Sequence, residues 1–228
     1  MKKRLAFALD VKDLKTAYNI LDEIEGLDII IKIGYVLFIQ GGSELLKRIK
    51  NKGFEIFLDL KLHDIPNTVK NGVYAARGLD VDYLTIHTLG GVDMIKKAVE
   101  AKEDSNLKLL GVTLLTSHGK DYTEYIGTRY SLDELALKLA EAGVYNGLDG
   151  IVCSAEEVEK IKKHINKNFL AVVPGIRPEG GESDDQTRIS TPKNAIQSGA
   201  DILVVGRPIL NSKDRRKTII QILSDIKN

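Results

Sequence analysis

The stretch FLDLKLHDIPNTV, residues 57–69, decides how this part of the chain can fold. Its first half alternates apolar residues with Asp59, Lys61 and His63, as in a largely buried strand. Asp59 and Lys61 are two residues apart, so on a strand their side chains share one face. The run then breaks at Ile65–Pro66, where we expect the chain to turn away rather than begin a helix. Since charges inside a buried strand are costly unless paired, these side chains should face a polar site.

Apolar runs of the same kind recur along the chain, rich in Ile, Val and Leu and only weakly alternating, which is typical of parallel strands covered on both faces. They are LAFAL (5–9), IIIKIG (29–34), FEIFLDLK (54–61), YLTIHT (83–88), LLGVTLL (109–115), GIVCS (150–154), LAVVPG (170–175) and ILVVG (202–206). Stretches with helical spacing lie between them. The clearest are LKTAYNILDEI (14–24), GSELLKRIKNK (42–52), DMIKKAVEAK (93–102), SLDELALKLAEAG (131–143) and AEEVEKIKKHI (155–165).

Three of the joints that lead into strands resemble one another. ARGLDVDYL (76–84), YNGLDGIV (145–152) and SGADILVV (198–205) each place a glycine and then an aspartate before the strand. We expect the glycine to be a left-handed helix cap. With 228 residues and no Pro/Gly/Ser-rich linker, the alternation predicts an α/β protein, a (β/α)8 TIM barrel that forms a single domain over residues 1–228. The alternative is an open doubly wound sheet, but the first strand lacks the GxGxxG fingerprint common there.

Composition argues against some partners and compartments. The formal net charge is +1, which gives no electrostatic reason to expect nucleic acid or an anionic membrane. The one cysteine, Cys153, lies in an apolar run and is interpreted as a buried thiol in a reducing compartment. The apolar run at Leu5–Leu9 is shorter than the roughly 7–15 residues of a signal peptide. No run approaches the roughly 20 residues of a membrane span, so we expect a cytoplasmic protein.

Polar residues recur at the same end of strand after strand. They are Asp10, Lys32, Asp59, Lys61, Asp64, His87, Thr116, Ser117, Arg177 and Arg207. Active sites of barrels lie at the carboxyl ends of the strands, so these residues predict one shared site.

Most of these residues also have a structural interpretation. Asp10 could instead cap the helix that follows. Lys32 could form a structural ion pair, and so could Asp59 with Lys61. We interpret His63 and His87 as structural or supporting residues, and His118 and His164 as surface residues.

The last two strands end in sequences that suit a phosphate. VPGIRP (173–178) and VVGRPI (204–209) each supply a glycine for close backbone approach and an arginine for forked hydrogen bonds to oxygen anions. Barrels often bind phosphate at these two loops. Between them, EGGESDDQTRISTP (179–192) is long, polar and glycine-rich, and it predicts a mobile lid in which Gln186 can both donate and accept hydrogen bonds.

The quoted residues resemble a known family. FLDLKLHDIPNTV is similar to the D-x-K-x-x-D signature of orotidine 5′-phosphate decarboxylases, and the other matching segments follow in that family's order over nearly the whole chain. These segments are FALD (7–10), IKIGYVLF (31–38), VTLLTS (112–117), VPGIR (173–177) and VVGRPI (204–209).

The resemblance implies that orotidine 5′-monophosphate loses CO2 to give uridine 5′-monophosphate, the last step of de novo pyrimidine synthesis. It implies no metal and no organic cofactor. Lys61 would donate a proton to C6, Asp59 would lie beside the departing carboxylate, and Lys32 would complete an alternating charge network.

The resemblance also implies a homodimer with shared active sites, in which Asp64, Ile65 and Thr68 complete the site of the partner. The remaining substrate contacts that it implies are Asp10 to the ribose, Thr116 to the pyrimidine, and Arg177, Gln186, Gly206 and Arg207 to the phosphate region.

Two other functions share parts of this pattern. Sugar-phosphate decarboxylases and aldol-type synthases with a similar D-x-K-x-x-D hold Mg²⁺ and look to have a glutamate ligand on the second strand. This chain has Lys32 there, and an ammonium cannot ligate a cation. A catalytically silent nucleotide-binding protein would tolerate the loss of Lys61 or Asp59, yet both are present.

Overall fold

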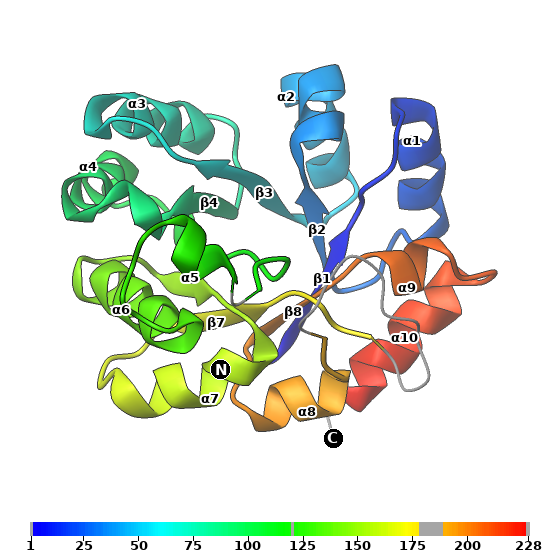
Figure 1. Ribbon diagram of the computed structural model, residues 1–228. Helices are drawn as coiled ribbons and strands as arrows, with labels where there is room; N and C mark the ends of the chain where they lie inside the picture. Colours follow the sequence, from blue (N-terminus) through cyan, green and yellow to red (C-terminus); the bar gives the residue numbers. More distant parts are fainter. Residues whose placement is uncertain (1, 120, 178–188, 227–228) are drawn as a thin grey trace.

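The apolar runs form parallel strands that close into a barrel in chain order, from β1 to β8, with β8 paired to β1 (Figure 1). This computed structural model describes residues 2–119, 121–177 and 189–226. The strands are β1 (Arg4–Ala8), β2 (Ile30–Ile33), β3 (Glu55–Leu62), β4 (Tyr83–His87), β5 (Lys108–Val112), β6 (Gly150–Val152), β7 (Leu170–Val173) and β8 (Ile202–Val205). The predicted TIM barrel is confirmed, and the open doubly wound sheet is wrong.

Helices form an outer ring around the strands (Figure 1). They are α1 (Leu14–Glu23), α2 (Tyr35–Asn51), α3 (Pro66–Arg77), α4 (Val92–Lys102), α5 (Asp121–Tyr125), α6 (Leu132–Tyr145), α7 (Ala155–His164), α8 (Pro192–Gln197), α9 (Arg207–Leu210) and α10 (Arg215–Asp225), with a 3₁₀ turn, η1, at Thr88–Gly90. In the described ranges, no helix combines the length and apolarity that crossing a membrane requires.

The core has two parts because side chains on a strand alternate in direction. In β1, Leu5 and Phe7 belong to the large cluster between the barrel and the helices. Ala6 and Ala8 belong to a smaller cluster inside the barrel, where Phe57 packs on Tyr83 with ring centroids 6.1 Å apart. Both faces of each strand are therefore covered, as the weakly alternating sequences predicted.

Two helices differ from the sequence expectations. The prediction that Ile65–Pro66 would not begin a helix is wrong, because Pro66 is the first residue of α3. Proline suits that position, since its missing N–H would have no intrahelical partner there. The helix predicted over 42–52 extends back to Tyr35, and Gly42, with φ of 47°, kinks it between two helical segments. The helical pattern that starts at Gly42 misses the first segment, because two successive glycines are poor helix formers and hide its continuation.

The similar joints before β4, β6 and β8 share one structural feature, an aspartate that is bonded to the preceding strand. The aspartate just before each strand accepts a hydrogen bond from a backbone N–H of the preceding strand. The N–H of Ile56 donates to Asp82 (2.7 Å), that of Leu109 to Asp149 (2.8 Å) and that of Ala171 to Asp201 (2.9 Å). A lysine from a surrounding helix pairs with each carboxylate: Lys50, Lys102 and Lys162. These hydrogen bonds and ion pairs hold neighbouring strands together at the amino-terminal end of the barrel.

The left-handed cap is present at only two of these joints. Gly147 and Gly199 have φ of 99° and 105°. At the first joint, Gly78 is right-handed with φ of −71°, and Asp80 takes the left-handed conformation with φ of 54°. Aspartate tolerates that conformation better than most residues, because its short side chain can form local hydrogen bonds.

Candidate active site

A cavity of about 660 Å³ opens where the strands end. Eight of the residues that line it were singled out in the sequence: Asp10, Lys32, Asp59, Lys61, Thr116, Arg177, Gly206 and Arg207. Sequence reasoning missed other lining residues, among them Tyr35, Phe57, Leu115 and Val152. Their apolar or aromatic character gave no functional signal, since the same pattern is expected of a core.

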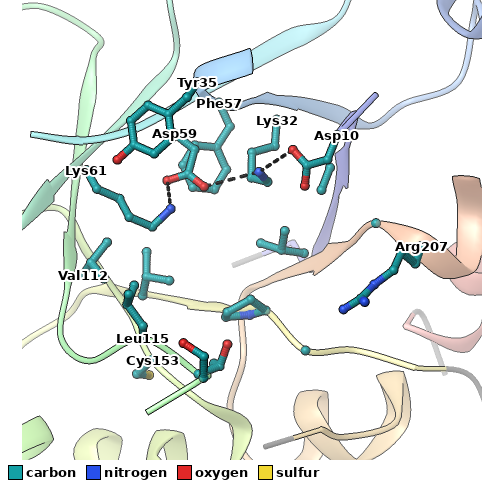
Figure 2. A pocket seen from close by; sticks show the side chains of 18 of the residues that line it. Asp10, Lys32, Tyr35, Phe57, Asp59, Lys61, Val112, Leu115, Cys153 and Arg207 are labelled. Atoms are coloured by element: carbon teal, nitrogen blue, oxygen red, sulfur yellow. Dashed lines mark hydrogen bonds and ion pairs between the residues drawn. The ribbon is translucent and has the colours of Figure 1, made fainter. Parts of the chain in front are cut away.

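Four charged side chains form a row along one wall of this cavity (Figure 2). Lys32 Nζ lies 3.3 Å from Asp10 Oδ1 and 3.3 Å from Asp59 Oδ2. Asp59 Oδ1 lies 2.8 Å from Lys61 Nζ. The order Asp10, Lys32, Asp59, Lys61 therefore alternates in charge, and the two middle members are buried.

The two buried members of the row hold each other in their charged forms. Burial by itself would raise the pKa of Asp59, but Lys32 and Lys61 outweigh burial and lower it. Burial by itself would likewise lower the pKa of Lys32, but the charges of Asp59 and Asp10 outweigh burial and raise that pKa. An ammonium between two carboxylates gains more from their charge than it loses from desolvation.

Asp59 and Lys61 both face the cavity, as their spacing predicted, but the strand between them is not regular. Leu58 pairs with Leu84 and Leu62 pairs with Ile86, so β3 bulges against β4 in between. Lys61 has φ of 46°, a left-handed conformation that is uncommon for residues other than glycine. Such outliers concentrate at functional sites, where the surrounding structure holds them in place.

Three predicted residues lie outside this cavity. Asp64, Ile65 and Thr68 are exposed, and none of them is among the residues that line it. Asp64 Oδ1 accepts a hydrogen bond from the backbone N–H of Ile65, and the side chain of Ile65 is 67% exposed. The chain therefore carries these three residues away from the mouth of its own barrel.

The two arginines predicted for phosphate both line the cavity, in different environments. Arg177 is 7% exposed, and its Nη1 donates to the carbonyl of Ile176 at 3.0 Å. Arg207 begins α9 directly after Gly206 and is less buried. It lies on the Asp10 side of the cavity, away from Lys61 (Figure 2). Gln186 and most of the predicted lid, residues 179–188, lie outside the described residues.

The structure decides between the alternatives for Asp10. The residue that caps α1 is Asp13, whose side chain accepts from the N–H of Thr16 at 2.8 Å. The capping interpretation of Asp10 is therefore wrong. Lys32, Asp59 and Lys61 do form the ion pairs that the structural interpretation required, and these pairs lie in the wall of the cavity.

None of the four histidines, all of which are among the described residues, lines the cavity. His63 and His87 stack with ring centroids 5.3 Å apart. Burial, together with the nearby His63, Lys61 and His118, lowers the pKa of His87 to about 4, so its ring is neutral at pH 7. His118 is half-buried and stacks on Tyr122 instead of lying free on the surface, whereas His164 is exposed beside Glu141.

The donor set of this cavity suits an ammonium more than a metal ion. Among the described residues, no group of three or more His, Cys, Asp or Glu side chains is arranged to hold a metal. The carboxylates of Asp10 and Asp59 that would attract a cation are already bridged by Lys32. Cys153 is buried as predicted, although it also lines the cavity.

A closed parallel barrel with a charged cavity at the carboxyl ends of its strands places the protein in the class of (β/α)8-barrel enzymes. Residues 3–222 match the orotidine 5′-phosphate decarboxylase / HUMPS family, and the chain belongs to this family.

Individual relatives agree with the family match. The chain is 43% identical to orotidine 5′-phosphate decarboxylase from Aquifex aeolicus (strain VF5), over 92% of this chain and 93% of the relative. A crystal structure of orotidine 5′-phosphate decarboxylase from Lactobacillus acidophilus matches with a TM-score of 0.89 and 36% identity, over 100% of both chains. The corresponding structure from Pyrococcus horikoshii OT3 matches with a TM-score of 0.80 and 26% identity, over 98% of this chain and 99% of that one.

Proposed function

We propose that this protein decarboxylates orotidine 5′-monophosphate to uridine 5′-monophosphate, the last step of de novo pyrimidine synthesis. The observation that carries the proposal is the alternating row Asp10–Lys32–Asp59–Lys61 in the cavity wall, in a chain of this family. A cytoplasmic location accompanies the proposal, because the sequence has a single cysteine, Cys153, as in a reducing compartment, and pyrimidine synthesis is an intracellular task.

Lys61 supplies the proton in this mechanism. The bond between C6 and the carboxylate breaks, CO2 leaves, and the electron pair stays on C6. The Lys61 ammonium stabilises that charge as it develops and then gives C6 a proton. Asp59 keeps the ammonium oriented through its 2.8 Å contact, and Lys32 on its other side keeps Asp59 ionised.

Asp59 has a second effect on the substrate. A substrate whose C6 approaches Lys61 brings its own carboxylate close to that of Asp59, because Asp59 and Lys61 are in contact. Two carboxylates at short range repel each other. The repulsion raises the energy of the bound substrate and disappears as CO2 leaves.

The other end of the cavity binds the remainder of the nucleotide. Asp10 contacts the ribose, Thr116 the pyrimidine, and Gly206, Arg177, Arg207 and Gln186 the phosphate. The phosphate does not react, so its binding energy serves to orient the base against Lys61.

The first prediction concerns these arginines. Arg207→Ala and Arg177→Ala should each weaken the binding of uridine 5′-monophosphate by about 10- to 100-fold, the loss of one charge-assisted hydrogen bond. Uridine, which lacks the phosphate, should bind equally to each variant and to the parent. Calorimetric titration of both ligands tests this.

If nucleotide and nucleoside lost affinity equally, the arginines would not bind the phosphate. Arg207→Ala is the cleaner variant, because Arg177 is buried and its loss also affects packing. A thermal unfolding curve for each variant separates the two effects.

We further propose a homodimer in which the partner's Asp64, Ile65 and Thr68 complete each site. Large apolar side chains are exposed at the start of α3 and on α2: Ile65 is 67% exposed, and Tyr35, Val36 and Ile39 are 52%, 53% and 81% exposed. Tyr35 contacts β3 directly through the carbonyl of Leu60. Large exposed apolar side chains favour burial against another protein surface.

The experiment that tests the function follows the fall in absorbance of orotidine 5′-monophosphate with purified protein. The matched control offers a sugar phosphate with Mg²⁺, the substrate class of the metal-dependent alternative. Turnover of the sugar phosphate and not of the nucleotide would overturn the proposal. Binding of nucleotide without turnover would support the catalytically silent alternative.

The second prediction is metal independence. Activity should survive exhaustive dialysis against a chelator, because the Lys32 ammonium occupies the position where a metal-dependent relative needs an oxygen ligand. Initial rates before and after dialysis, and after adding Mg²⁺ back, provide the measurement. A large loss that Mg²⁺ restores would contradict the prediction.

A further inference from the structure

The bulge in β3 is held by a buried side chain that lies outside the cavity. Thr85, in the middle of β4, is 1% exposed. Its Oγ1 accepts a hydrogen bond from the backbone N–H of Lys61 at 2.8 Å. The same oxygen lies 2.9 Å from Asp59 Oδ1 and donates its proton there.

These contacts close a ring of hydrogen bonds around Lys61. The backbone N–H of Lys61 is bonded to Thr85, Thr85 to Asp59, and Asp59 to the Lys61 ammonium at 2.8 Å. The two ends of Lys61, its amide and its Nζ, are therefore fixed relative to each other through only two side chains. A long, flexible lysine side chain is held in one position by this arrangement.

The bulge makes this support necessary. Between the paired positions Leu58–Leu84 and Leu62–Ile86, β3 advances by four residues while β4 advances by two. The Leu60–Lys61 peptide lies in this gap, and side chains bond to both of its ends. The hydroxyl of Tyr35 donates to the Leu60 carbonyl at 2.9 Å, and Thr85 accepts from the Lys61 N–H.

We infer that Thr85 is a positioning residue for the reaction, which holds the left-handed backbone at Lys61 and thereby aims its ammonium at the reacting carbon. The inference rests on the proton-donor role given to Lys61 under the proposed function. Thr85 does not line the cavity, so it acts only through Lys61 and Asp59.

Removal of this hydroxyl should affect chemistry more than binding. In Thr85→Val the shape is kept, but the Lys61 N–H loses its acceptor and Asp59 loses a donor. Lys61 is then free to leave its strained conformation, and the ammonium moves away from C6. The phosphate end of the cavity does not depend on Thr85, so substrate affinity is retained.

The expected result is a fall in kcat of about 10²-fold for Thr85→Val, the effect of displacing a catalytic group by about 1 Å. KM and the Kd for uridine 5′-monophosphate should stay near the parent values. Thr85→Ser, which keeps the hydroxyl, should recover most of the rate. Recovery by serine would separate the hydroxyl's role from that of the methyl group in packing.

Thr88→Val is the matched control. Thr88 is also 1% exposed, and its hydroxyl donates to the carbonyl of Val112 at 2.8 Å, but it lies outside the cavity lining and the charged row. It should also lower the thermal unfolding midpoint, but by less than Thr85→Val, because Thr88 loses one buried hydrogen bond and Thr85 loses two. Its kcat should remain at the parent level.

The inference fails if the kcat of Thr85→Val equals that of Thr88→Val. It also fails if the KM of Thr85→Val rises by the same factor by which its kcat falls. A crystal structure of Thr85→Val provides a readout besides activity. We expect Lys61 to lose its positive φ or its contact with Asp59; a structure with both unchanged would overturn the inference. If the parent protein does not turn over orotidine 5′-monophosphate, the proposed function fails, while this crystal structure still decides whether Thr85 positions Lys61.

Discussion

Lys61→Ala is expected to lower the turnover of orotidine 5′-monophosphate by at least about 10⁴-fold, the upper end of what one general acid contributes. The variant removes both the proton for C6 and the charge that stabilises the carbanion. It leaves intact the end of the cavity at Arg207, which lies away from Lys61. Uridine 5′-monophosphate should therefore still bind.

The decisive measurements are single-turnover rates together with the Kd for the product nucleotide. Lys97→Ala is the matched control, since Lys97 lies on α4, is 49% exposed and pairs only with Glu100 among the described residues. It should keep the parent rate. Near-normal turnover by Lys61→Ala would show that another group donates the proton, and the mechanism proposed above would be wrong.

Mixing two inactive variants is expected to restore activity if the sites are shared between subunits. In the proposed dimer each site takes Lys61 from one chain and Asp64 from the other. A dimer of one Lys61→Ala chain and one Asp64→Ala chain has one site with both defects and one intact site. Random exchange makes about half the dimers mixed, so about a quarter of the parent activity should return by this symmetry argument.

The control for this experiment is a pair that cannot complement. Lys61 and Asp59 contact each other within one chain, so Lys61→Ala mixed with Asp59→Ala should restore nothing. Exchange of subunits is followed independently with differently tagged chains. If subunits exchange and the Lys61→Ala and Asp64→Ala mixture stays inactive, Asp64 does not complete the partner's site.

The barrel, and the end of it at which the site lies, could be predicted from the sequence. Weakly alternating Val, Ile and Leu runs separated by amphipathic stretches leave few architectures besides a parallel barrel, since both faces of every strand must be covered. The same runs placed Lys32, Asp59 and Lys61 at strand ends. These conclusions depend on local spacing, which the sequence contains in full.

Other features of the site depend on residues that meet only after folding. The backbone N–H of Lys61, at the bulge, donates to Thr85, which is 24 residues away. In the sequence YLTIHT, Thr85 is indistinguishable from an ordinary strand residue. A possible signal was the alternation of Tyr83, Thr85 and His87, which puts a hydroxyl on the inner face of β4 beside Asp59. Without the pairing register of β3 and β4, however, that alternation does not identify its partner.

Helix boundaries show the same division. Proline at position 66 was a correct sign of a boundary, but whether it ends one element or begins another depends on what the chain packs against afterwards. The sequence left Asp10 as a candidate for a helix cap, whereas the structure assigns the cap to Asp13 and pairs Asp10 with Lys32. Local spacing determines the type and order of the elements. The partner of each polar group depends instead on contacts between strands that are distant in the sequence, and these form only when the barrel closes.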